Sequence, residues 1–185
     1  MKSIAIFFGT KKKQRGRQTV NSELRIEELT QDRVEIFTKI KADAYADDRT
    51  KVSFDDCEKP AWFDGDWYVG LGIYNLEETK NLMQQFSCYL IYKGEEPIGI
   101  FWVHVEEENS LTLEDFCIHP KYQGKGYGTE SLQLIESYFD NRRWLLTTPI
   151  FCKRNRHLYE KNGYKKIGYV SDGTVIVYEK LLAEK

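Results

Sequence analysis

A glycine-rich loop near the middle of the chain has residue types that could bind a phosphate group. It lies between an alternating apolar segment, 111–118, and an amphipathic segment, 126–139. Glycines let backbone N–H groups turn toward a ligand, and a helix that begins there adds the positive end of its dipole. We therefore predict a cradle for a phosphate or pyrophosphate, with Thr129 as a further contact at the helix start. The loop residues are Gln123, Gly124, Lys125, Gly126, Tyr127 and Gly128.

Two common nucleotide-binding patterns do not fit this loop. A Walker loop needs Ser or Thr directly after its lysine, and Gly126 follows Lys125 here. The dinucleotide pattern G-x-G-x-x-G belongs to an early βαβ unit, whereas the preceding segments here suggest antiparallel strands. Taken alone, the loop could also be a strand-to-helix turn without a ligand.

A second segment, 154–168, reads RNRHLYEKNGYKKIG and predicts a short helix over 155–161 that Asn162 and Gly163 end. On its own, Tyr159 in this helix would be read as a core residue. Together, the two segments resemble motifs A and B of the GNAT (GCN5-related N-acetyltransferase) superfamily in order and separation, and the resemblance covers about residues 24–182. Many members have Asn where this chain has Cys152 and Ala where it has Asn155, but some carry R-N-H-x-x-Y-E-K, which is closer to this sequence.

The resemblance implies a set of site residues. The pyrophosphate of acetyl-CoA would lie on the N–H groups of 123–128, and Asn155 would contact the pantetheine arm. That arm would pair with the backbone of Phe116, Cys117 and Ile118, and an N–H near Cys117–Ile118 would stabilise the oxyanion. Tyr159 would protonate the leaving thiolate. Cys117 is expected to be an ordinary buried residue, because no histidine adjoins it to activate the thiol.

The acceptor amine must lose a proton before it attacks, which requires a general base. Glu114, just ahead of the cofactor stretch, is the predicted base, acting through water. Asp115 is the alternative, and strand alternation should place these two carboxylates on opposite faces of the sheet. An acid from residues 43–66 is also left open.

Residues 43–66 are rich in acids, and aromatic residues lie among and just after the later ones. Carboxylates between aromatic walls suit a cationic amine through charge attraction and cation–π contact. Alternatively, the aromatic residues pack into the core beside a solvated loop. The aromatic residues are Trp62, Phe63, Trp67 and Tyr68.

The composition, 41% hydrophobic and 30% charged, is typical of a soluble globular protein. Residues 1–22 carry a charge of +6 within a net charge of −2, so we expect a basic N-terminal extension ahead of one domain over 23–185. The acidic remainder argues against a nucleic-acid partner. No stretch could span a membrane, and a homodimer is left open.

The four cysteines and three histidines lack metal-ligand spacing, so no metal is expected. Reduced thiols in the cytoplasm are the plain interpretation of the cysteine pattern.

Elements to position these residues can be read from the periodicity. Strands are expected at 3–8, 24–29, 87–93, 98–105, 111–118, 144–148, 164–170 and 174–181, and helices at 32–45, 76–86, 126–139 and 155–161, the first fraying into the acids at 47–48. The predicted fold is α/β: a mixed, mostly antiparallel twisted sheet with helices on both faces and a V-shaped cofactor cleft between the fourth and fifth strands of the domain. The predicted function is acetyl-CoA-dependent acetylation of a primary amine on a cationic small molecule or a protein, in a ternary complex. The alternative is a non-catalytic acyl-CoA-binding or regulatory module.

Overall fold

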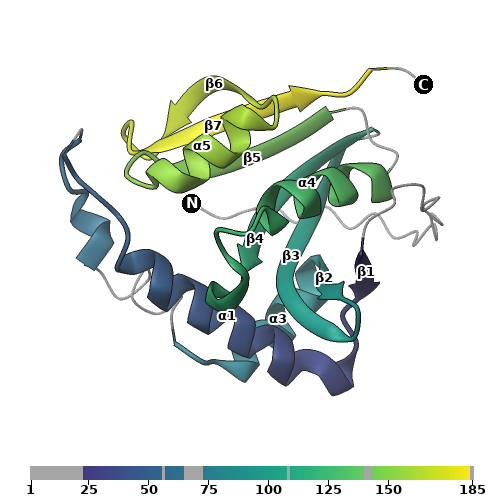
Figure 1. Cartoon of the computed structure of the whole chain (residues 1–185). Coiled ribbons are helices and arrows are strands. Elements are labelled where there is room, and N and C mark those ends of the chain that lie inside the picture. The colour runs from purple at the N-terminus through teal and green to yellow at the C-terminus, as the bar shows by residue number, and fades with distance from the viewer. Residues whose placement is uncertain (1–22, 56, 65–72, 108, 140–142, 184–185) are drawn as a thin grey trace.

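A computed structural model describes residues 23–55, 57–64, 73–107, 109–139 and 143–183. Its centre is a seven-stranded sheet in the order β1-β2-β3-β4-β5-β7-β6 (Figure 1). Only β4 and β5 pair in parallel; all other neighbours are antiparallel. The strands are β1 Leu24–Glu28, β2 Ser87–Lys93, β3 Glu96–Glu107, β4 Ser110–Ile118, β5 Arg143–Pro149, β6 Lys165–Val170 and β7 Val175–Leu181.

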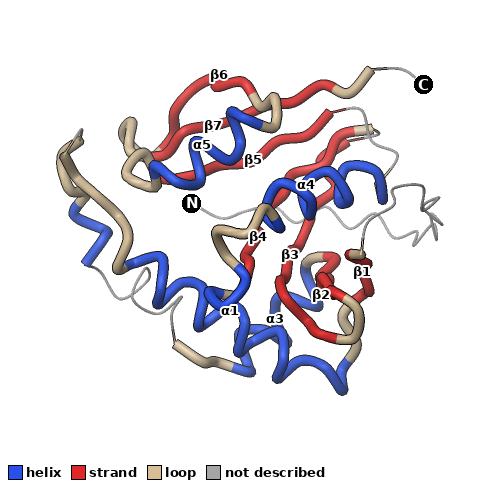
Figure 2. Tube along the Cα trace, viewed as in Figure 1, coloured by secondary structure: helices blue, strands red, loops and turns tan. Residues whose placement is uncertain are grey.

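Four α-helices accompany the sheet in the described part of the chain (Figure 2). They are α1 Val34–Arg49, α3 Leu76–Gln85, α4 Tyr127–Tyr138 and α5 Lys153–Lys161. The expected positions are confirmed, but the fraying expected after Tyr45 is wrong. Helix α1 continues to Arg49, so Asp47 and Asp48 lie in its last turn.

Two hydrophobic cores lie on opposite faces of the sheet. Leu132 and Ile135 of α4 share one core with Tyr159 of α5, whereas Phe37 and Ile40 of α1 belong to the other. The strand β2, next to the edge strand β1, contributes to both cores, since Cys88–Tyr92 are all buried. The prediction of helices on both faces is therefore confirmed.

The parallel strands β4 and β5 separate soon after they meet. They pair only from Ser110–Leu113 to Arg143–Leu146, after which β4 continues to Ile118 and β5 to Pro149. The later part of β4 thus has β3 on one side and an unpaired edge on the other. This divergence is the V-shaped cleft predicted between the fourth and fifth strands.

A β-bulge at Glu114 changes which way the side chains of β4 point. Asp115 is opposite Trp102 and Leu113 is opposite Val103, which leaves Glu114 without a partner in β3. Beyond the bulge, Cys117 packs on the α1/α3 core and Asp115 bonds Tyr45 of α1. Glu114 lies on that side too, 3.7 Å from His104, whose ring packs on Phe86 at the end of α3. The expectation that Glu114 and Asp115 lie on opposite faces is wrong, because the extra residue breaks the alternation.

The basic segment 1–22, the strand expected over 3–8, and Trp67 and Tyr68 lie outside the described residues. The four cysteines are free thiols in this structure. Among the described helices, none has the combined length and hydrophobicity that a membrane crossing requires.

Candidate active site

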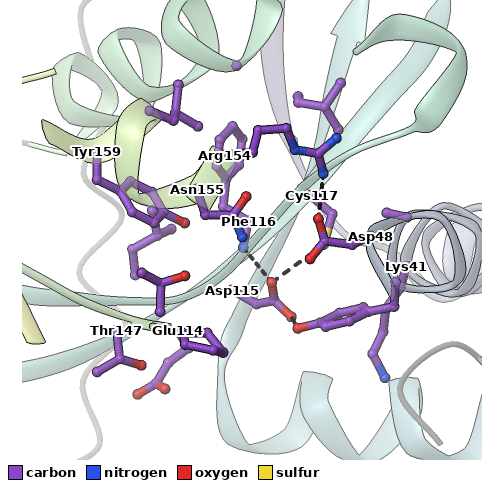
Figure 3. A pocket seen from close by; sticks show the side chains of 18 of the residues that line it. Lys41, Asp48, Glu114, Asp115, Phe116, Cys117, Thr147, Arg154, Asn155 and Tyr159 are labelled. Carbon is purple, nitrogen blue, oxygen red and sulfur yellow. Dashed lines mark hydrogen bonds and ion pairs between the residues drawn. The ribbon is translucent and has the colours of Figure 1, made fainter. Parts of the chain in front are cut away.

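The divergence of β4 and β5 opens a cavity of about 940 Å³ (Figure 3). Its walls come from α1, α3, β4, the glycine loop, the end of β5 and α5. Of the predicted residues it includes Glu114, Phe116, Cys117, Ile118, Gln123, Gly124, Gly126, Gly128, Thr129, Asn155 and Tyr159. Segments far apart in the sequence therefore meet in one site.

The glycine loop leaves a set of backbone N–H groups without helical partners. Gly124 and Gly126 have φ values of 72° and 88°, a left-handed conformation that glycine adopts without penalty. Helix α4 begins at Tyr127, and its first turn closes with the 3.2 Å bond from the Glu130 N–H to the Gly126 carbonyl. The N–H groups in the first turn of α4, before Glu130, therefore make none of the helical hydrogen bonds of α4 and suit an anion at the helix start.

Three side chains around the loop have partners of their own. Lys125 Nζ donates to the Lys121 carbonyl at 3.0 Å, and the Tyr127 hydroxyl bonds Lys93. Neither residue lines the cavity with its side chain, so their contribution to an anion site would be the main chain. Thr129 lines the cavity, and its hydroxyl is 3.4 Å from the Asn162 amide.

The unpaired edge of β4 exposes the backbone of alternate residues. The His119 N–H donates to the Ile98 carbonyl of β3 at 2.9 Å, which marks the hydrogen-bonded pairs of this antiparallel ladder. Cys117 is two residues earlier in continuous register, so its N–H and C=O also face β3. Phe116 and Ile118 face the cleft instead. Of the three residues expected to pair with pantetheine, only these two offer backbone groups to the cleft.

Two of the four backbone groups at this edge already have side-chain partners. Asp115 Oδ1 accepts the Phe116 N–H at 2.7 Å, and Gln123 Nε2 donates to the Ile118 carbonyl at 2.7 Å. The Phe116 carbonyl and the Ile118 N–H are the groups that remain for a ligand.

Tyr159 points into the cleft from α5 (Figure 3). It is buried, and burial raises the pKa of its hydroxyl well above the usual value, with the negative charge of Asp115 adding to the effect. Within the described residues, its hydroxyl has no hydrogen-bond partner. The group is thus a protonated donor throughout the neutral range.

The carboxylate of Asp115 and the thiol of Cys117 lie together in the wall of the cavity. Burial raises the pKa of Asp115, although its bonds from Tyr45 and the Phe116 N–H oppose the shift. Asp115 also lies 3.5 Å from Cys117 Sγ. Burial, assisted by Asp115, raises the pKa of the Cys117 thiol well above its usual value, which disfavours a covalent acyl-cysteine route.

Several wall residues were not singled out from the sequence. Tyr45, Lys41 and Asp48 come from α1, Glu78 from α3 and Arg154 from α5. Lys41 is buried and pairs with Glu78, while Arg154 pairs with Asp48 at 2.6 Å. Two of them had a sequence signal: Asp48 lies in the acidic segment 43–66, and Arg154 lies inside the second motif.

The aromatic residues near the end of α1 form a core of their own. Phe63 packs edge-on against Phe54 at 4.9 Å and against Phe151 at 5.1 Å. Trp62 joins this cluster, donates to Thr174 at 3.2 Å and also lines the cavity. The alternative that these residues pack into the core is therefore confirmed for Phe63, and Trp62 contributes to both core and wall.

Comparisons with known proteins agree with this geometry. The sequence matches the family described as "Acetyltransferase (GNAT) family" over residues 34–164. No curated protein sequence matches the chain. Among solved structures, a GNAT-family acetyltransferase from Streptococcus agalactiae aligns with a TM-score of 0.69 at 17% identity, covering 87% of this chain and 96% of that one.

Two further structures have named acceptors. Spermidine N-acetyltransferase from Vibrio cholerae, in complex with CoA and spermine, aligns with a TM-score of 0.63 at 15% identity, covering 87% of this chain and 96% of that one. The ribosomal-protein-S18-alanine N-acetyltransferase from Escherichia coli aligns with a TM-score of 0.61 at 14% identity, covering 88% and 96%. These likenesses show the same fold. Since the family match covers more than half of the sequence, the chain belongs to the GNAT acetyltransferase family.

Proposed function

We propose that this protein transfers an acetyl group from acetyl-CoA to a primary amine by direct attack in a ternary complex. The observation that carries the proposal is the cleft between β4 and β5, with the glycine loop at one end and the Tyr159 hydroxyl inside it. Such a cleft can hold a thioester and an amine at attack distance, which is the main requirement of acyl transfer.

In this proposal, the backbone of the chain holds the donor. The N–H groups of 124–129 bind the pyrophosphate, because the Gln123 N–H already donates to the Pro120 carbonyl at 3.2 Å. A pantetheine amide N–H donates to the Phe116 carbonyl. Asn155, which lines the same cavity, contacts the pantetheine arm. The Ile118 N–H is left for the oxyanion, because it faces the cleft and the Cys117 N–H does not.

Two side chains move the protons. An alkyl ammonium has a pKa of about 10.4, so the acceptor must be deprotonated near neutral pH. We assign this step to Glu114 through water, since Glu114 lines the cavity and is more exposed than Asp115. Tyr159 donates its proton toward the sulfur as the thiolate leaves.

The acceptor side favours a positively charged amine, such as a polyamine or a protein amino group. Glu114 and Asp115 lie there together, while the nearby cation Lys41 is paired with Glu78. The neighbours that act on spermidine and on a ribosomal-protein alanine also use amine acceptors. The four free thiols fit a reducing compartment such as the cytoplasm.

The test is free-thiol release from acetyl-CoA across polyamines, aminoglycosides, amino acids and peptides, beside calorimetry with CoA alone. Thiol release with one amine class would support the proposal and identify the acceptor class. CoA binding with no release from any amine would favour the non-catalytic acyl-CoA-binding module. Absence of CoA binding would overturn both.

A further inference from the structure

Three side chains form a polar bridge between the two arms of the cleft. Arg154, in the first turn of α5, donates through Nη2 to Asp48 Oδ1 and through Nη1 to Gln123 Oε1, each at 2.6 Å. Gln123 then donates through Nε2 to the Ile118 carbonyl at 2.7 Å. The bridge joins the last turn of α1, the glycine loop, the open edge of β4 and the start of α5 (Figure 3 shows its Asp48–Arg154 link).

The hydroxyl of Tyr159 makes no hydrogen bond to the described residues, so its place depends on how its ring and its helix are held. Tyr159 lies on the same short helix as Arg154, and its ring packs against Tyr164 and Tyr178 at centroid distances of 5.9 and 6.1 Å. These contacts hold one side of the ring against the core, while the residue lines the cavity. The distance from the hydroxyl to the open edge of β4 depends on where α5 lies relative to that strand.

The charges of the bridge stabilise one arrangement. The Asp48 side chain is 18% exposed, and burial raises the pKa of its carboxyl while the Arg154 guanidinium opposes that shift. Without Arg154, the carboxylate would lose its cation and keep the Cys152 thiol at 3.8 Å as a weak donor, so α1 would have to shift or the group take up a proton. The ion pair of Asp48 and Arg154 therefore links helix α1, which lines the cavity, to helix α5.

We propose that Asp48, Arg154 and the Gln123 side chain are positioning residues that set the width of the cleft between β4 and Tyr159. The inference rests on the proposed acetyl transfer. It assigns the Gln123 side chain to the bridge and not to the cofactor. The bridge then acts on turnover more than on CoA affinity.

The experiment compares Asp48→Asn, Arg154→Met, Arg154→Lys and Asp48→Asn/Arg154→Met with wild type. We expect each of the first two variants to lower kcat by up to about 100-fold, the effect of displacing a reacting group by about 1 Å, with CoA Kd changed less than about threefold. The double variant should be no slower than the worse single variant, because both remove one link. Arg154→Lys should keep part of the activity. Lys153→Met is the matched control, since Lys153 is the adjacent cation and reaches Asp55 at 3.8 Å; its kcat should equal that of wild type.

A second readout does not depend on turnover. With 3-fluorotyrosine at position 159 alone, the ¹⁹F resonance should move in Asp48→Asn and Arg154→Met but stay in place in Lys153→Met. An unmoved resonance in the first two would overturn the inference even in an inactive protein. Weaker CoA binding with unchanged kcat would also overturn it, because Arg154 would then be a cofactor contact. Wild-type protein that turns over no amine would count against the proposed function alone.

Discussion

Asp115 Oδ1 accepts the main-chain N–H of its neighbour Phe116 at 2.7 Å. The bond occupies one of the two backbone donors at the open edge of β4 and leaves the Ile118 N–H as the other. It also engages a half-buried carboxylate that the bulge has turned toward the same side as Glu114. The two carboxylates therefore have different tasks in the proposed mechanism, and they can be separated experimentally.

Glu114→Gln should lower kcat/KM at pH 7 by about 10²-fold, because the acceptor then lacks a base. Activity should recover as the pH approaches the pKa of the free amine, about 10.4, where the acceptor arrives deprotonated. The measurement is the pH profile of thiol release, with Asp115→Asn as the comparison. Loss and recovery in Asp115→Asn but not in Glu114→Gln would make Asp115 the base.

Asp115→Asn should stabilise the protein at neutral pH. Burial raises the pKa of Asp115 in the folded state, so the folded state binds its proton more tightly than the unfolded state does. The resulting stabilisation of the folded state is fully present below the pKa of Asp115 in the unfolded state, about 3.9. It is lost as the pH rises through the pKa of Asp115 in the folded state. The Tm of Asp115→Asn should therefore exceed that of wild type by more at pH 7 than at pH 4. A gap that widens toward low pH would contradict the argument.

Tyr159→Phe should lower kcat by about 10²-fold and leave the acetyl-CoA Kd unchanged, since the lost hydroxyl acts only on the leaving thiolate. Steady-state kinetics and calorimetry measure the two quantities. Tyr169→Phe, which removes a hydroxyl from a half-exposed tyrosine of β6, is the control and should behave as wild type. Normal turnover in Tyr159→Phe would remove Tyr159 from the acid role.

Gly126→Asp should weaken CoA binding on the order of 10²-fold, because a carboxylate near the pyrophosphate repels it. A Cβ at Gly126 would meet no atom within 4 Å, so steric overlap is not the cause. Gly126→Asn is the matched control: asparagine tolerates the left-handed φ of 88° and carries no charge. Calorimetry should show most of the loss only in the aspartate variant. Equal affinities in both variants would argue against an anion at this loop.

Gly99→Ala should destabilise the fold by about 1–3 kcal/mol and weaken CoA binding. A Cβ on Gly99 would lie 2.8 Å from both the Cys117 carbonyl and Ile118 Cδ1, so β4 must move at its open edge. Gly168→Ala in β6 meets nothing within 4 Å and should change stability by less than about 0.5 kcal/mol. Denaturant unfolding and CoA calorimetry test both. If Gly99→Ala is destabilised but binds CoA with wild-type affinity, the open edge of β4 is not a contact of the cofactor.

The elements with local signals were predictable from the sequence. The glycines at 124 and 126, the amphipathic α4 and the Tyr159 helix depend on residues a few positions apart, so their patterns show in a linear reading. Their order along the chain also matched the family, which implied the cleft and the place of Tyr159 within it.

Other features were decided by contacts between distant residues. The bulge at Glu114 depends on pairing with β3, and it reversed an expectation that rested on strand alternation alone. Asp115 meets Tyr45 across 70 positions and Arg154 meets Asp48 across 106, separations at which no periodicity operates. The sequence by itself thus determined the glycine loop, the helix that carries Tyr159 and the family resemblance. Which backbone groups face the cleft, where the acids point and what holds α5 in place were decided by the tertiary structure, because these properties arise only when the strands pair and the helices pack.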